Sequence, residues 1–232
     1  MFDKKVYVIP SETTIKIRVI IEELFSDGVS LIFYEKFYEL NEEWLFDGSI
    51  VSCEMLKSIL ENMFPAYSYK KNYFTNNVLS KPELQRIHSE ISRVWGDVIL
   101  LNYNKIAERL PYIPIEKIKS ALSQSNTFLW NSVETYANIN KILVSADELT
   151  RIHECVSKVC AEHGYVSISD VPLAEIIENN DDLSVTAIHS AIYNLCLEDE
   201  FDKNGKMLVH KGDTASALQI IKEYCEKIDK CW

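Results

Sequence analysis

The tetrapeptide Lys119-Ser120-Ala121-Leu122 has two counterparts in this chain, Lys57-Ser58-Ile59-Leu60 and His189-Ser190-Ala191-Ile192. Each follows an amphipathic segment, a short apolar stretch and a second, smaller helical pattern. The repeat is clearest in the last two copies, where the sequence LQRIH at 84–88 matches LTRIH at 149–153. Apolar residues then recur at the spacing that places one stripe on a helix. The sequence therefore predicts one structural unit that occurs three times.

The rest of each unit follows in the same order. Brief apolar stretches at 29–33, 98–101 and 165–168 predict short strands, and β-favouring segments at 67–75, 128–142 and 201–209 follow the third helix. The second helices are aligned as 106–110 with 173–177, which pairs Ala107 with Ala174 as small residues for close helix packing. In the first unit the longer segment 34–49 predicts an expanded turn.

The order helix, strand, helix, turn, helix and hairpin resembles a winged helix-turn-helix domain. The resemblance implies a mainly α fold with small β-hairpin wings, arranged as three tandem winged-helix domains plus a C-terminal helix. The predicted units are residues 1–80, 81–146 and 147–212, with borders near 78–82 and 144–147. An amphipathic helix is expected over 213–232, and residues 6–9 are expected to form a short strand.

Charge differs between the three units although their pattern is shared. The chain of 232 residues has a net charge of −11. The first 80 residues contribute −4, residues 81–146 contribute +2 and the remainder contributes −9. No apolar run approaches the roughly 18 residues of a membrane span, and the six scattered cysteines suggest reduced thiols. These features predict a cytoplasmic protein without membrane contact.

The middle unit offers the one coherent basic surface. In DNA-binding winged-helix proteins the third helix usually enters the major groove, so the resemblance implies a DNA contact here. The candidates in the middle unit are Lys105, Arg109, Glu116, Lys117, Lys119, Ser120 and Ser123. The first unit adds Lys57 on its third helix and Lys70 and Lys71 in its wing. The alternative is that these residues form an ordinary solvated face.

The third unit is acidic and is expected to repel phosphate. Its acidic side chains could attract a basic protein partner, although solubility explains them equally well. They are Glu175, Glu178, Asp181, Asp182, Glu198, Asp199 and Glu200. The leading hypothesis is a DNA-binding protein, such as a regulator or replication accessory. The alternative is an acidic winged-helix scaffold that assembles proteins without binding nucleic acid.

Catalytic and metal-binding patterns are weak. The sequence has no Gly-x-Ser-x-Gly, no glycine-rich phosphate loop and no His-Glu-x-x-His. His153, Cys155, Cys160 and His163 lie close in sequence, but on a helix they cannot converge on one tetrahedral ion. No catalytic activity, cofactor or metal is therefore expected, and the sequence does not indicate an oligomeric state.

Overall fold

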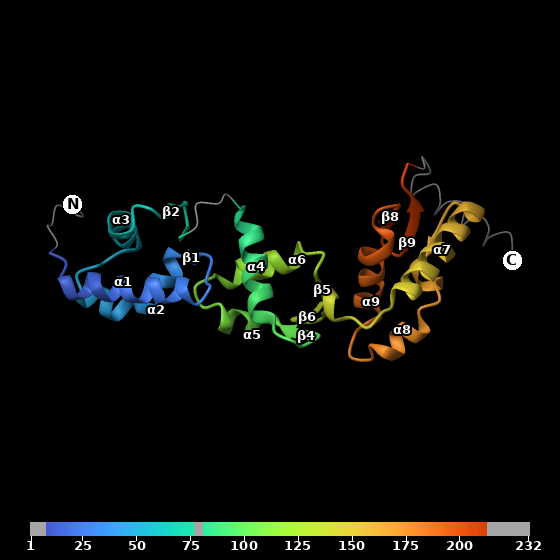
Figure 1. Cartoon of the computed structure of the whole chain (residues 1–232), viewed down its shortest axis with the longest axis horizontal. Coiled ribbons are helices and arrows are strands. Elements are labelled where there is room, and N and C mark those ends of the chain that lie inside the picture. Colours follow the sequence, from blue (N-terminus) through green and yellow to red (C-terminus); the bar gives the residue numbers. More distant parts are fainter. Residues whose placement is uncertain (1–7, 77–80, 213–232) are drawn as a thin grey trace. The chain divides into compact units, whose positions relative to one another are not determined.

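The computed structural model describes residues 8–76 and 81–212, and it is mainly helical with small antiparallel sheets (Figure 1). The predicted order of helix, strand, helix, helix, strand and strand occurs three times along the chain. The chain divides into two compact units, Met1–Ser125 and Asn126–Trp232. The predicted helix over 213–232 and residues 6–7 of the predicted strand over 6–9 lie outside the described residues, and residues 8–9 are not part of a strand.

The first repeat lies wholly in the first unit. Its first helix buries Thr13, Ile17, Ile21 and Phe25, which are spaced by four and therefore share one face. In its sheet, β3 pairs antiparallel with both other strands, in the order β1-β3-β2. The elements are α1 (Ser11–Ser26), β1 (Ile32–Phe33), α2 (Tyr34–Asp47), α3 (Cys53–Met63), β2 (Ser68–Tyr69) and β3 (Tyr73–Thr75).

The expanded turn predicted for residues 34–49 is wrong, because α2 occupies almost all of this segment. Phe37 and Leu45 are fully buried, and Asn41 between them donates a side-chain hydrogen bond to the Phe37 carbonyl at 2.7 Å. This spacing of four continues one inward stripe along a single helix. The chain turns only after Gly48, at Ser49, whose φ of 66° is left-handed.

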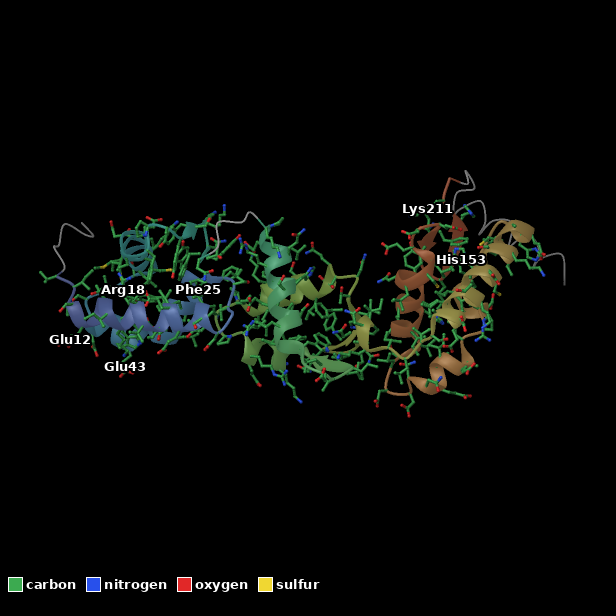
Figure 2. All side chains as sticks on the ribbon, viewed as in Figure 1. Glu12, Arg18, Phe25, Glu43, His153 and Lys211 are labelled. Atoms are coloured by element: carbon green, nitrogen blue, oxygen red, sulfur yellow. The ribbon has the colours of Figure 1, made fainter. Side chains whose placement is uncertain are left out.

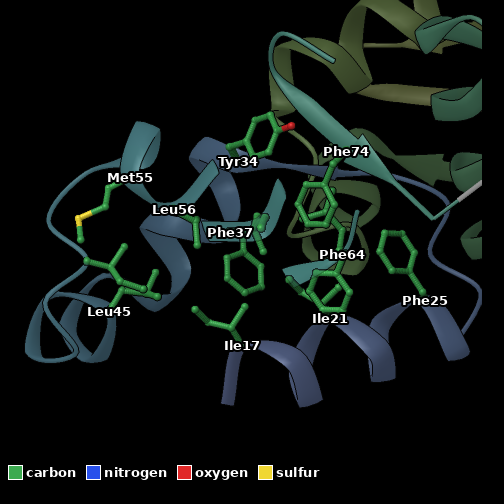
Figure 3. Close-up of a cluster of buried hydrophobic side chains, with 13 residues drawn as sticks. Ile17, Ile21, Phe25, Tyr34, Phe37, Leu45, Met55, Leu56, Phe64 and Phe74 are labelled. Carbon is green, nitrogen blue, oxygen red and sulfur yellow. The ribbon is translucent and has the colours of Figure 1, made fainter. Parts of the chain in front are cut away.

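The core of the first repeat is rich in aromatic side chains (Figure 3). Phe74 of β3 is fully buried and stacks on Tyr34 with ring centroids 5.4 Å apart. Phe25 meets Phe74 edge to face at 5.9 Å. Such contacts add to the free energy gained by removing the rings from water. Tyr73 is also buried, at 5% exposure, so these aromatic residues of β3 serve the core.

The first unit also contains the helical part of the second repeat. Ile87, Ile91 and Trp95 form the buried stripe of its first helix. The His88 Nε2 atom lies 2.7 Å from the Ala121 carbonyl oxygen of the third helix. The elements are α4 (Glu83–Trp95), β4 (Leu100–Asn102), α5 (Tyr103–Arg109) and α6 (Ile115–Ser123).

The two repeats of the first unit are joined through a buried carboxylate. Glu90 of α4 is 2% exposed, and its Oε1 atom accepts a 2.7 Å hydrogen bond from the Ser30 backbone N–H. Its Oε2 atom pairs with Arg93 at 2.7 Å. Beside it, the Phe33 N–H donates to the carbonyl of Tyr112 at 3.1 Å. The turn before α6 is therefore held against the first repeat.

The second unit begins with the hairpin of the second repeat and continues through the third. In the last sheet, β9 lies between β7 and β8, and the hairpin turns at Gly205 as the sequence predicts. The elements are β5 (Phe128–Ser132), β6 (Thr135–Asn138), the 3-10 helix η1 (Ile139–Lys141), α7 (Ala146–His163), β7 (Val166–Ser167), the 3-10 helix η2 (Ile168–Asp170), α8 (Ala174–Asn179), α9 (Val185–Ile192), the π-helix η3 (Tyr193–Leu197), β8 (Phe201–Asn204) and β9 (Met207–His210).

The hairpin of the second repeat contacts the helices that follow it in the second unit. The Asn131 Oδ1 atom of β5 accepts a 2.6 Å hydrogen bond from the Ser184 N–H, just before α9. The side chain of Asn180 exchanges two hydrogen bonds with the Leu143 backbone, at 2.8 and 2.9 Å. As in the first unit, the turn before the third helix is occupied by contacts with the preceding repeat.

The predicted alignment of the second helices is shifted by three residues. Leu110 ends α5 with φ −122° and ψ 58°, and Asn180 ends α8 with nearly the same values, −130° and 50°. The buried Ile106 therefore corresponds to Ile176. Ala174 is exposed and does not mediate close helix packing. The shift arose because Leu173 and Ile176 are both buried, and either could be matched with Ile106.

Candidate interaction surfaces

Two lysines of α6, the centre of the predicted DNA contact, are both paired with carboxylates. The Nζ atom of Lys117 lies 2.6 Å from Glu83 Oε1 on α4. Lys119 lies 3.3 Å from Glu116 Oε1 and 4.8 Å from the ring centroid of Tyr103. The hydrogen bond with Glu116 raises the pKa of Lys119. Each positive charge is thus offset by a neighbouring negative one, which weakens attraction to phosphate.

The other candidates of the second repeat are exposed but differ in their contacts. Arg109 donates a 2.7 Å hydrogen bond to the Val94 carbonyl, which holds the guanidinium against α4. Lys105 is exposed on α5. Ser120 accepts a 2.8 Å hydrogen bond from Gln124, and Ser123 donates one to the Ser120 carbonyl. The two serines are thus engaged within their own helix.

The basic candidates of the first repeat lie near one another beside the β2–β3 hairpin. Lys57 is half-buried on α3, where its ammonium lies 5.4 Å from the Tyr34 ring centroid. Its Nζ atom is also 3.5 Å from the Lys70 carbonyl, so Lys57 and Lys70 are brought together. Lys70 and Lys71 are exposed between β2 and β3. This is a small cationic site, and Lys71 lines the same hollow as Lys117 of α6.

The start of α6 faces a hollow of about 530 Å³ within the first unit. The hollow brings together three glutamates that are each the second residue of a helix: Glu35 of α2, Glu54 of α3 and Glu116 of α6. Lys71 and Lys117 are the basic residues of its lining. A phosphate approaching the start of α6 would therefore meet three carboxylates.

The acidic residues of the third repeat form two groups rather than one field. Glu175, Glu178, Asp181 and Asp182 are exposed on and after α8. The second group, Glu198, Asp199 and Glu200, follows the far end of α9 and η3. The intervening helical residues span roughly 20 Å. Sequence proximity alone could not show that α9 separates the two groups.

Two acidic residues of the second group already have partners. Glu198 accepts a hydrogen bond from the Asn126 side chain at 3.3 Å, and Glu200 lies 3.3 Å from His153 Nε2. Figure 2 shows His153 on α7. Near the first group, Glu175 shares a hollow of about 330 Å³ with Glu148 and Arg151.

His189, which begins the third tetrapeptide on α9, is only 8% exposed. Burial lowers its pKa. Two of the thiols are disfavoured as nucleophiles, because burial raises the pKa of Cys53 and raises that of Cys196 to about 11. Within residues 8–76 and 81–212, no group of three His, Cys, Asp or Glu residues could hold a metal ion.

The sequence interpretation missed the outer face of α2. Glu35, Glu39, Glu42, Glu43 and Phe46 are all exposed there, and Glu43 points away from the ribbon in Figure 2. Their spacing of four, three, one and three residues is the pattern of one helical face. This helical spacing was present in the sequence, but it was not looked for because the segment was interpreted as a turn.

Comparison with known proteins found no matching family model and no matching curated protein. In the part of the chain that the structure describes, none of the helices combines the length and the apolar character needed to cross a bilayer.

Proposed function

We propose that this chain is a tandem winged-helix scaffold that binds protein partners, and that its middle repeat does not serve as a DNA reader. The observation that carries the proposal is that the lysines of α6 are paired with carboxylates. Lys117 and Lys119 are each paired with a glutamate, and the start of the helix faces Glu35 and Glu54 of the first repeat. A recognition helix needs free donors and positive charge where it meets DNA.

A second observation supports the same proposal. In each unit the turn before a third helix is used for contacts with the preceding repeat, through Tyr112 in one and Asn180 and Ser184 in the other. In the second and third repeats, the turn before the third helix is therefore occupied by contacts within the chain. Within each unit, these contacts fix the helix faces of adjoining segments relative to one another, which suits the binding of proteins.

The DNA-binding alternative is tested by titrating a fluorescein-labelled duplex with the full chain at ~50 and ~150 mM salt. The variants are Lys117→Glu with Lys119→Glu, and the matched control Lys158→Glu with Lys211→Glu. The scaffold proposal predicts only weak, non-specific binding at ~150 mM salt, with dissociation constants of roughly 10⁻⁴ to 10⁻⁶ M, that the α6 variant changes no more than the control. Nanomolar binding that only the α6 variant loses would overturn it.

Affinity capture of the full chain from cells, with and without nuclease, tests the claim that the chain binds protein partners directly. A scaffold retains the same protein partners after nuclease treatment, because the contacts are direct. Loss of every partner on nuclease treatment would show that nucleic acid carries the association, and the proposal would then fail.

A further inference from the structure

The outer face of α2 is an exposed acidic stripe with an aromatic side chain at its end. Because residues 34–47 form one continuous helix, Glu35, Glu39, Glu42, Glu43 and Phe46 lie along one side of it, opposite the buried stripe. The stripe is about 16 Å long at 1.5 Å per residue. Phe46 is 62% exposed, although it is a large apolar residue.

This arrangement works against the stability of α2. Glu35 and Glu39, and Glu39 and Glu43, are like charges four residues apart, a spacing that destabilises a helix. Lys36 is the one basic residue of α2, and it lies 2.6 Å from Glu39. Glu43 and Asp47 lie near the negative end of the helix dipole, and the last turn of α2 contains no basic residue to offset them.

The exposed apolar residues are not required by the core. The same helix already buries Tyr34, Phe37 and Leu45 on its inner face. Leu40, at 53% exposure, lies beside Glu43 on the helix surface and adds a second apolar group. An apolar anchor within a repulsive acidic field is a local conflict of the kind that proteins keep at functional sites.

We infer that the outer face of α2 docks a basic segment of a protein partner. Lysine or arginine side chains of that segment pair with Glu42 and Glu43 and share Glu39 with Lys36, and an apolar side chain covers Phe46. This pairing relieves the repulsion along α2 and removes the aromatic ring from water. The inference rests on the proposed scaffold function and names the chemical class of its partner.

The acidic residues of the third repeat are the rival site in the same chain, so the test compares the two. The probe is a fluorescein-labelled peptide of eleven residues in which lysines alternate with leucines, titrated with the full chain at ~150 mM salt. The test variant is Glu39→Gln, Glu42→Gln and Glu43→Gln. The matched control, Glu175→Gln, Glu178→Gln and Asp199→Asn, makes the same change in net charge.

The test variant is expected to bind the peptide at least tenfold more weakly, and the control less than twofold more weakly. Phe46→Ser is expected to weaken binding several-fold without changing its salt dependence. The urea midpoint of the test variant is expected to equal or exceed that of the wild type, because repulsion along α2 has been removed. This measurement separates lost binding from lost folding.

Equal losses in the test variant and the control would overturn the inference, as would a peptide that does not bind the wild type. Either result leaves the scaffold proposal standing, because that proposal depends on the duplex titration and the nuclease-treated capture. Nanomolar, α6-dependent DNA binding would instead overturn the scaffold proposal itself.

Discussion

Replacing Glu90 with alanine should loosen the joint between the first two repeats. The carboxylate is 2% exposed and accepts hydrogen bonds from the Ser30 N–H at 2.7 Å and from Arg93 at 2.7 and 3.2 Å. Glu90→Ala removes the acceptor and leaves the Ser30 N–H without its partner. The Arg93 side chain is 37% exposed, so water can solvate the guanidinium after the substitution.

The magnitude follows from these contacts. A hydrogen bond to a charged group contributes about 1.5–3 kcal/mol, and an orphaned buried donor costs about 1–3 kcal/mol. With the Arg93 contribution reduced for its exposure, we expect the joint to lose about 3 kcal/mol. Since 1.4 kcal/mol is a factor of ten, local opening should become about 100-fold more frequent. Glu90→Gln retains an acceptor for Ser30 and should show a smaller effect.

Native-state hydrogen exchange measures this opening at single amides. The reporters are Ser30, bonded to Glu90, and Phe33, bonded to the Tyr112 carbonyl across the same joint. Both should exchange about 100-fold faster in Glu90→Ala, while Ile188 in the second unit should be unchanged. Ser89→Ala, an exposed change on the same helix, is the control. If the amides of Ser30 and Phe33 exchange in Glu90→Ala at the same rate as in the wild type, the carboxylate of Glu90 does not hold the two repeats together.

Three further changes test the packing. A Cβ atom at Gly48 would lie 2.5 and 2.6 Å from Thr13 side-chain atoms, so Gly48→Ala should cost about 1–3 kcal/mol in a urea titration, and Thr13→Ala should recover part of it. Burial lowers the pKa of His189 below its ordinary 6.5, so the stability of its neutral form is complete above that pH and is lost as pH falls. The urea midpoint of the wild type should therefore fall between about pH 7.5 and about pH 5.5. The fall should be smaller in His189→Gln, and it should be as large as in the wild type in the control His163→Gln. An equal fall in all three proteins would contradict this prediction. Ser145→Ala removes the capping box of α7 and should cost about 1 kcal/mol, and an unchanged thermal midpoint would argue against the cap.

The element order was predictable because hydrophobic spacing is local. Ile87, Ile91 and Trp95 lie on one face of α4, and Ile152, Val156 and Cys160 lie on one face of α7, so matching sequence gave matching helices. The segment 34–49 was misread because it is longer than its counterparts and contains the run EEWLF at 42–46, which was interpreted as an insertion in a turn. The burial of Phe37 and Leu45 on the side opposite the glutamates confirms that the segment is one helix.

The candidate surfaces depended on contacts between distant residues, which spacing does not encode. Lys117 is partly exposed on α6, but its partner Glu83 lies on another helix. His189 occupies the same place in its repeat as Lys119, yet it is buried where Lys119 is not. Equivalent positions in a repeat share backbone geometry, whereas their charge environment depends on what packs beside them.

A residue-resolved NMR titration of the full chain is the most direct test of the claim that this array binds protein through α2 and does not read DNA through α6. The chain is titrated separately with the lysine–leucine peptide and with duplex DNA at ~150 mM salt. We expect peptide-induced shifts concentrated in the amides of Tyr34–Asp47, and no saturable shifts with the duplex. Saturable, duplex-induced shifts in Ile115–Ser123, with α2 unaffected by the peptide, would contradict it.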